Sequence, residues 1–273
     1  WFLIGRGAKL LPKEAYIPRK VTDLHGVFNG CSILEKVVIP SSVTILGSSS
    51  QYPFQTCYSL GAIILPRSLT EVGNSAMGQC YSLRVLSLPP TITIIGNGAI
   101  SYCYSLKKIT LPRGLLSLGQ FCFQYGCLKE ISLPSSLTSI GSSCLVQNKC
   151  LRKINIPAGV SVLSYGALNS CDALEIVELN EGLESIGTAV FENARALQTL
   201  TIPSTVTSIG NSAFNSSYCL PIVTVLATTP PALGSSVFGS GLKKIYVPAG
   251  SVEAYKSATN WANYAEKIEA IPA

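Results

Sequence analysis

Apolar and polar residues alternate in short bursts along this chain, and the same burst returns many times. Residues 106–112 read L-K-K-I-T-L-P, and residues 128–134 read L-K-E-I-S-L-P. The period-2 alternation places Ile109 and Leu111 on one face of a short β-strand. The proline that follows has no N–H to donate to a strand ladder, so it ends the strand. After a two-residue turn comes a second short apolar run closed by glycine, as in L-T-S-I-G at residues 137–141.

The strand-ending prolines set the period of the repeat. They stand at Pro18, Pro40, Pro66, Pro89, Pro112, Pro134, Pro157, Pro203 and Pro248. Successive intervals are 22 to 26 residues, except for the last two, of 46 and 45 residues, which are double periods filled at Asn180 and Ala227. About eleven turns of roughly 23 residues therefore cover almost the whole chain, and a repeat of this length predicts a solenoid.

A segment of the form (A/C)-(F/L/I/V)-x-x-C, such as residues 99–103, links the runs. It is too short for an ordinary helix, and we expect it to form one helical turn. No repeat can bury its apolar side alone, so the repeats must stack into one continuous core with neighbouring strands ~4.8 Å apart. Eleven turns at that spacing give a rod or arc of roughly 50 Å.

The C-terminal residues depart from the repeat and are expected to cap it. Ser251 can N-cap a short helix that runs through about Ser257. Trp261 and Tyr264 would then cover the last turn, and residues 267–271 would form one closing strand. The chain therefore divides into a solenoid over residues 1–248 and a cap of the same domain over residues 249–273.

The repeats resemble the BspA-type (Treponema-type) leucine-rich repeat of bacterial, and some protozoan, surface proteins. The shared marks are I-G-x-x-(A/C)-(F/L/I/V)-x-x-C-x-x-L-x-x-I-x-(I/L)-P, which recur over about residues 10–248, and I-Y-V-P-A-G-S-V-E-A-Y-K at residues 245–256. The resemblance implies a leucine-rich-repeat right-handed solenoid, mostly β with short helical turns, and a concave parallel sheet. It also implies a cell-surface or secreted location and a role in adhesion or protein binding.

Composition narrows the choice of environment and partner. Apolar residues make up 47% of the chain and charged residues only 12%. No apolar run reaches the ~18 residues of a membrane span, so none is expected. The net charge of +6 is not gathered into a Lys/Arg block, so nucleic acid is not an expected partner. Because the chain begins at Trp1 rather than Met, we expect that a leader was removed and that the protein is extracellular or at the cell surface.

Little in the chain indicates catalysis. It has one histidine, His25, and two aspartates, Asp23 and Asp172. The sequence lacks H-E-x-x-H, G-x-S-x-G, P-loop and dinucleotide-binding motifs. We therefore expect no enzymatic activity, no catalytic residue, no cofactor and no metal site, and we interpret His25 beside Asp23 as part of a turn or a solvated edge.

The ten cysteines follow the repeat. A metal or redox site would need close pairs such as C-x-x-C, which are absent, so we predict mostly free, buried thiols that fill a recurring core position. Disulfides between adjacent turns are geometrically conceivable for Cys122–Cys144 and Cys127–Cys150. The residues at or near the C-x-x-L position are Cys31, Cys57, Cys80, Cys103, Cys171 and Cys219, whereas Cys122 and Cys144 sit at the alanine position and Cys127 and Cys150 lie two residues off the ladder.

Residues at the x positions of L-x-x-I-x-I-P point away from the core and are the candidate binding residues. One column is basic in four consecutive turns and consists of Arg84, Lys107, Lys129 and Arg152, with Lys108 and Lys153 beside it. Stacked like charges are unfavourable unless an anionic partner or solvent screens them. The column is either a docking stripe for an acidic protein or acidic glycan, or a solvated edge that keeps the sheet soluble.

A short tyrosine ladder, Tyr58, Tyr81 and Tyr104, follows the cysteines, and Tyr125 lies next to it. Stacked aromatic rings on a rim could contact sugars or peptides, or they could simply stabilise the stack. We therefore expect a non-enzymatic binding or adhesion module that docks partners on the concave face or the aromatic rim. The alternative is a structural stalk or spacer that presents another domain.

Overall fold

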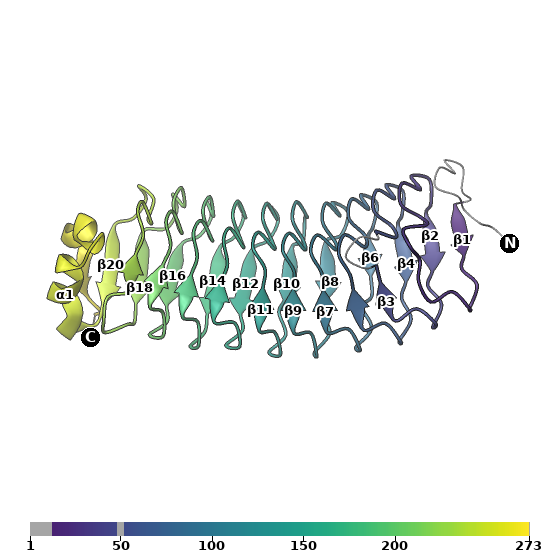
Figure 1. Cartoon of the computed structure of the whole chain (residues 1–273). Coiled ribbons are helices and arrows are strands. Elements are labelled where there is room, and N and C mark those ends of the chain that lie inside the picture. Colours follow the sequence, from purple (N-terminus) through teal and green to yellow (C-terminus); the bar gives the residue numbers. More distant parts are fainter. Residues whose placement is uncertain (1–12, 48–51, 273) are drawn as a thin grey trace.

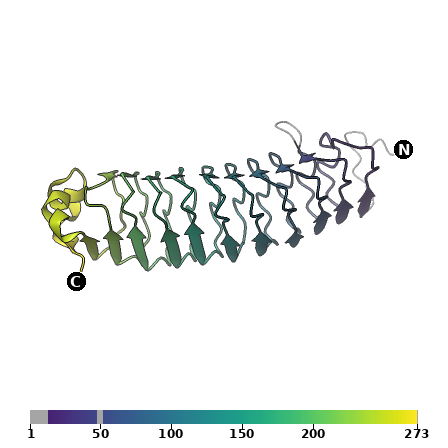
Figure 2. The ribbon, with the colours of Figure 1, turned by 90° about the horizontal axis from the view of Figure 1, so that it is seen from below.

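The computed structural model describes residues 13–47 and 52–272 and shows a parallel β-solenoid of about eleven turns. The turns stack along one axis into a long, nearly straight rod (Figure 1). Most turns contribute one strand to each of two rows on opposite sides of the rod (Figure 2). The predicted solenoid of about eleven turns is confirmed, although the part of it expected before residue 13 lies outside the described residues.

The first row of strands is built from the L-x-x-I-x-I-P segments, and we call its outer surface the strand face. Alternation decides its burial: Ile109 is buried while Lys108 and Thr110 on either side are exposed. Neighbouring strands are parallel. The row consists of β1 (Glu14–Tyr16), β2 (Lys36–Val38), β4 (Ala62–Ile64), β6 (Val85–Leu86), β8 (Lys108–Thr110), β10 (Glu130–Ser132), β12 (Lys153–Ile156), β14 (Ile176–Leu179), β16 (Thr199–Ile202), β18 (Ile222–Val225), β20 (Lys244–Val247) and β21 (Ile268–Ala270).

The second apolar run of most repeats forms a shorter strand on the opposite side of the rod. These strands are also parallel, and each has one buried residue, such as Ile140. The row consists of β3 (Ile45–Leu46), β5 (Glu71–Val72), β7 (Ile94–Ile95), β9 (Ser117–Leu118), β11 (Ser139–Ile140), β13 (Val162–Leu163), β15 (Ser185–Ile186), β17 (Ser208–Ile209) and β19 (Ala232–Leu233).

The third segment of each repeat is a chain of turns in place of the single helical turn expected. Gly98 and Tyr102 both have positive φ, of 58° and 57°. The N–H groups of Gly98, Ile100 and Tyr102 donate to carbonyls of the next turn at 2.7, 3.0 and 2.8 Å. In a helix these groups would bond back within the same turn. The segment therefore adds a third ladder of hydrogen bonds between turns.

Most of the cysteines face the core, as predicted, and they also act as hydrogen-bond donors. The thiols of Cys57, Cys80 and Cys103 donate to backbone carbonyls of the preceding turn, at 3.0, 3.2 and 3.4 Å. In other turns the same donation comes from the side-chain amide of Asn148 at 2.7 Å and the hydroxyl of Ser217 at 3.0 Å. The ladder position thus favours a small side chain that can donate.

The prediction of mostly free, buried thiols holds, but Cys219 departs from it and one of the conceivable disulfides is present. Cys219 is exposed, because Ser217 rather than Cys219 occupies the ladder position of its turn. Of the two conceivable disulfides, Cys127–Cys150 is formed, with its Cα atoms 5.1 Å apart. Cys122 and Cys144 remain buried thiols.

The cap follows the expected order of a short helix, covering aromatic residues and a closing strand. After η1 (Ala249–Ser251) come α1 (Val252–Ser257) and η2 (Trp261–Lys267), which close the C-terminal end of the rod (Figure 1). Trp261 is fully buried, and its indole N–H donates to the carbonyl of Pro231 at 2.7 Å. The strand expected over residues 267–271 is β21.

Ser251 does not cap α1 through its side chain, contrary to expectation. Its hydroxyl instead donates to the carbonyl of Thr228 at 2.7 Å, in the preceding part of the chain. The hydroxyl of Tyr255 donates in the same way to the carbonyl of Ala227 at 2.7 Å. These bonds tie the cap to the last turns of the solenoid.

Without reductant, we expect Ellman's reagent at pH 8 to react with about one thiol per folded chain, that of Cys219. The reagent needs the thiolate, and burial raises the pKa of Cys57, Cys103 and Cys171 to about 12. After denaturation the eight free thiols should all react. The control variant Cys219→Ser should abolish the reaction of the folded chain, and a denatured count of ten would contradict the Cys127–Cys150 disulfide.

Candidate functional site

The outward side chains of the strand face form columns along the rod, because most neighbouring strands pair in register. Lys36, Ala62 and Val85 are successive members of one such column. Tyr16, Val38 and Ile64 are successive members of another. The columns therefore place residues together that lie more than twenty residues apart in the chain.

All four residues of the predicted basic column, Arg84, Lys107, Lys129 and Arg152, are exposed. Lys107 donates to the backbone carbonyl of Tyr104 at 2.7 Å, a bond that leaves its charge unbalanced. Arg152 lies 3.8 Å from the carboxylate of Glu175, so its positive charge is balanced by an ion pair. In the described part of the chain, Arg84, Lys107 and Lys129 form no ion pair, so the positive charge is concentrated on these three turns.

The charges of the two flanking lysines, Lys108 and Lys153, are each balanced by a glutamate of the next turn. Lys108 forms an ion pair with Glu130, its direct neighbour in register. Lys153 Nζ lies 2.5 Å from Glu178 Oε1. Exposed ion pairs of this kind contribute little stability, but they remove net charge from the surface. Lys108 and Lys153 therefore add no net positive charge to the strand face, whereas Arg84, Lys107 and Lys129 do.

The tyrosine ladder is a packed stack. Tyr58 and Tyr81 have ring centroids 4.8 Å apart, and Tyr81 and Tyr104 are 5.3 Å apart. A second stack, Tyr102 on Tyr125, has a centroid distance of 4.8 Å and meets Tyr104 edge-on. The three side chains of the ladder remain partly exposed, although their neighbouring rings pack against one another. The ring-to-ring packing favours the interpretation that the ladder stabilises the stack.

Tyr102 was not singled out from the sequence. Its signal is that it precedes Tyr125 by one repeat period, so that the two must lie over each other. Burial, together with the neighbouring tyrosines, raises the pKa of Tyr102 and Tyr104 above the ordinary value. Arg84 and Lys107 each follow a tyrosine by three residues, so the tyrosine row and the cations lie on the same turns.

An exposed apolar patch on the N-terminal half of the strand face also escaped the sequence analysis. Tyr16 is 83% exposed, Val38 48%, Ile64 50% and Val85 69%. Tyr16, Val38 and Ile64 are direct neighbours in register, and Val85 is the register partner of Ala62 in β4. The signal in the sequence is apolar residues at the outward x positions. We call these four exposed residues the apolar row.

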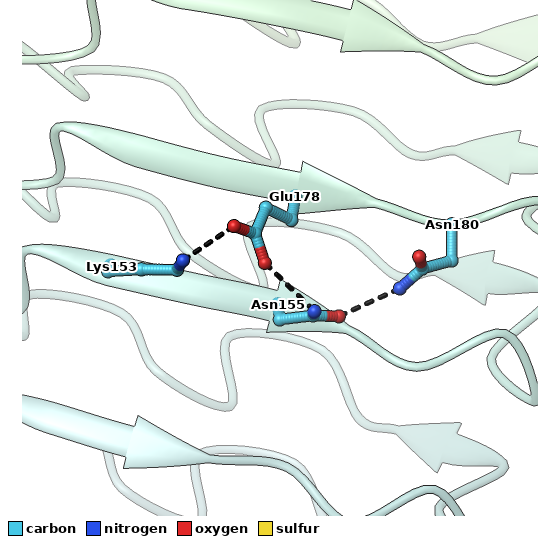
Figure 3. A network of polar contacts seen from close by, with 4 residues as sticks. All are labelled: Lys153, Asn155, Glu178 and Asn180. Atoms are coloured by element: carbon cyan, nitrogen blue, oxygen red, sulfur yellow. Dashed lines mark hydrogen bonds and ion pairs between the residues drawn. The ribbon is translucent and has the colours of Figure 1, made fainter.

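The C-terminal half of the strand face carries a polar network (Figure 3). Glu178 accepts hydrogen bonds from Lys153 at 2.5 Å and from the side-chain amide of Asn155 at 2.9 Å. Asn180 in turn donates to Asn155 Oδ1 at 2.7 Å and to the carbonyl of Ile156 at 2.6 Å. The hydrogen bond from Lys153 is the main cause that lowers the pKa of Glu178.

A shallow hollow of about 430 Å³ lies beside this network. It exists where the repeat pattern is broken, since Asn180 stands in the place of the strand-ending proline. Proline could not make the two bonds of the Asn180 amide. The residues that line the hollow include Asn155, Ile176, Glu178, Asn180, Thr199 and Thr201.

His25 and Asp23 lie in an exposed turn. The backbone N–H of His25 donates to Asp23 Oδ1 at 2.9 Å, and the two side chains are 3.4 Å apart. Within residues 13–47 and 52–272, no three His, Cys, Asp or Glu side chains gather as a metal site requires. None of the helices within these same residues has the length and apolarity needed to span a bilayer.

Comparison with known proteins points to one family. The model of the "BspA type Leucine rich repeat region (6 copies)" matches residues 24–152, 93–222 and 138–260. None of the curated proteins compared matches the chain.

Solved structures of similar form are leucine-rich repeat proteins and a bacterial antigen. The pneumococcal vaccine antigen PcpA is 18% identical with a TM-score of 0.53, over 87% of this chain and 66% of that one. A leucine-rich repeat protein from Bacteroides ovatus is 22% identical with a TM-score of 0.44, over 95% and 84%. The T. pallidum leucine-rich repeat protein is 27% identical with a TM-score of 0.45, over 67% and 77%.

The Lys153–Glu178 contact can be tested by titration. We expect Lys153→Gln to move the pKa of Glu178 upward toward the ordinary value of a glutamate, because the bond that favours the carboxylate is lost. Carboxyl chemical shifts followed by NMR as a function of pH measure this pKa. Lys108→Gln, which breaks a different lysine–glutamate pair, is the matched control and should leave Glu178 unchanged. A Glu178 pKa that stays low in Lys153→Gln would mean that another group holds it down.

Proposed function

Because the chain belongs to the family of BspA-type leucine-rich repeat proteins, we propose that it is a non-enzymatic scaffold that docks an acidic protein on its strand face. The docking surface comprises the apolar row (Tyr16, Val38, Ile64 and Val85) and the unpaired cations Arg84, Lys107 and Lys129 beside it. Tyr81 and Tyr104 of the tyrosine ladder lie on the same turns as Arg84 and Lys107.

One observation carries this proposal: three stacked cations have no ion-pair partner among the described residues, while their neighbours Lys108 and Lys153 do. Like charges stacked at strand spacing repel one another, and a glutamate in the next turn relieves this elsewhere on the same face. Where no such glutamate is present, an acidic partner would supply the missing charge. It would also be steered toward the surface by the positive field.

The apolar row favours a protein over an acidic glycan as the partner. Contiguous exposed apolar residues mark surfaces that other molecules cover. Aliphatic or aromatic side chains of a polypeptide can pack on Val38, Ile64 and Val85, whereas a polyanionic glycan would engage only the cations. A partner with apolar anchors flanked by carboxylates matches both parts of the surface.

We further propose that the protein works at the cell surface or outside the cell. The Cys127–Cys150 disulfide supports this location, because disulfides persist in oxidising compartments. The alternative role, a stalk that presents another domain, uses the length of the rod but gives no purpose to the unpaired cations or the apolar row.

The test is binding to a panel of purified serum and extracellular-matrix proteins, with a salt titration. Charge reversal of the three cations (Arg84→Glu, Lys107→Glu and Lys129→Glu together) should weaken binding by at least about tenfold, or 1.4 kcal/mol. Wild-type binding should also weaken as salt rises, since exposed charges are screened.

A matched control has the same change in net charge elsewhere. Arg19, Arg67 and Arg113 are all exposed and each follows a strand-ending proline, so Arg19→Glu, Arg67→Glu and Arg113→Glu together should leave binding intact. Val85→Ser should weaken the binding of a protein but not of heparin. Equal loss in both triple variants, or binding of heparin alone, would refute the proposed docking of an acidic protein.

A further inference from the structure

The hollow beside Glu178 lies at a seam in the strand face. Strand β12 pairs with β14, and β16 pairs with β18. Within the described chain, however, no residues of β14 pair with residues of β16. The outward residues of β16 at this seam are the short side chains Thr199 and Thr201, next to the longer Ile176 and Glu178 of β14. A break in strand pairing also separates β10 from β12, so it is the step in side-chain length that distinguishes this seam.

The polar groups at the hollow are held in place before any ligand arrives. Both carboxylate oxygens of Glu178 are fixed, Oε1 by Lys153 and Oε2 by Asn155. The amide nitrogen of Asn180 is fixed by two acceptors, which turns its Oδ1 away from Asn155 (Figure 3). Groups held by neighbours in this way lose little freedom when a ligand binds.

Several of these groups retain hydrogen-bonding capacity. An ionised carboxylate has about four lone-pair sites, and Glu178 uses two of them in the network. Asn180 Oδ1 and the hydroxyls of Thr199 and Thr201 make no hydrogen bond to the described residues. The hollow therefore offers several acceptors and two hydroxyls that can also donate, around the half-exposed aliphatic side chain of Ile176.

The charges at the hollow select against ionic ligands. An anion would meet the carboxylate of Glu178, which its hydrogen bond from Lys153 keeps ionised. A cation would find that carboxylate already balanced by the Lys153 ammonium at 2.5 Å. What fits is an uncharged ligand with several hydroxyl donors close together and one apolar face for Ile176. A pyranose ring has both.

We propose that this hollow binds one unit of a neutral saccharide, with its hydroxyls on Glu178, Asn180, Thr199 and Thr201 and its C–H face on Ile176. Its volume of about 430 Å³ lies in the range of small-molecule sites, and its open side lets a glycan chain continue beyond it. The site shares no residue with the docking surface at Arg84, Lys107 and Lys129, so each proposal can be tested without the other.

The experiment is saturation-transfer NMR on the whole chain with four probes: the methyl glycosides of glucose, galactose, mannose and N-acetylglucosamine. Because no aromatic ring stacks on the sugar, we expect at least one probe to bind with a Kd on the order of 1–10 mM. Thr199→Val with Thr201→Val, which keeps shape and strand preference but removes both hydroxyls, should weaken that binding at least about fivefold, or ~1 kcal/mol. Glu178→Gln should weaken it as well.

Thr110→Val is the matched control, since Thr110 is an outward residue of β8 that does not line the hollow, and it should bind as the wild type does. Melting curves should show that all variants remain folded. The proposal is overturned if none of the four glycosides binds at about 20 mM, or if the double valine variant and Glu178→Gln both bind as tightly as the wild type. Tighter binding of glucuronate or of a short neutral peptide than of every glycoside would also overturn it.

Discussion

Each turn of this rod is bonded to the next through residues that occupy the same place in the repeat, and the rest of the structure depends on that register. Two rows of strands and one row of turns supply backbone hydrogen bonds along the rod. Inside, a thiol at Cys80, an amide at Asn148 and a hydroxyl at Ser217 make equivalent bonds to the preceding turn. A buried carbonyl left without a donor costs about 1–3 kcal/mol, which explains why donors recur at this position even though Ala194 shows that a turn can do without one.

The register also explains what could be predicted from the sequence. Period-2 alternation was enough to place Ile109 in the core and Lys108 outside it, and the loss of the pattern after Pro248 was enough to locate the cap around Trp261. The positive φ of Tyr102 could not be foreseen, because it is imposed by bonds to the next turn and leaves no mark in residue type. The ion-pair partner of Lys153 could not be foreseen either, because Glu178 is its diagonal neighbour and Ile176 is the residue directly opposite.

The strict register also stacks side chains of the same type on the outside of the rod, as it does inside. Aromatic rings gain from this, as Tyr58 and Tyr81 show, whereas stacked cations repel. The chain relieves that repulsion at Lys108 and Lys153 by placing a glutamate in the following turn, but not at Arg84, Lys107 and Lys129. The difference separates charge that is balanced within the fold from charge that is available to a partner, and counting lysines and arginines alone would not reveal it.

Because stacking fixes the inward residues, the outward ones can vary from turn to turn with small effects on stability, roughly 0.5 kcal/mol each. Departures from the repeat are therefore the informative positions: Ile64 and Val85 at outward sites, and Asn180 in place of proline. They divide the strand face into an apolar and basic half and a polar half. Three turns separate Lys129 from Gln198, beside Thr199, a distance of roughly 15 Å along the rod. A partner protein docked as proposed on the first half would reach the margin of the second only if it extended about 15 Å beyond Lys129, so its size along the rod would decide whether a saccharide could occupy the hollow at the same time.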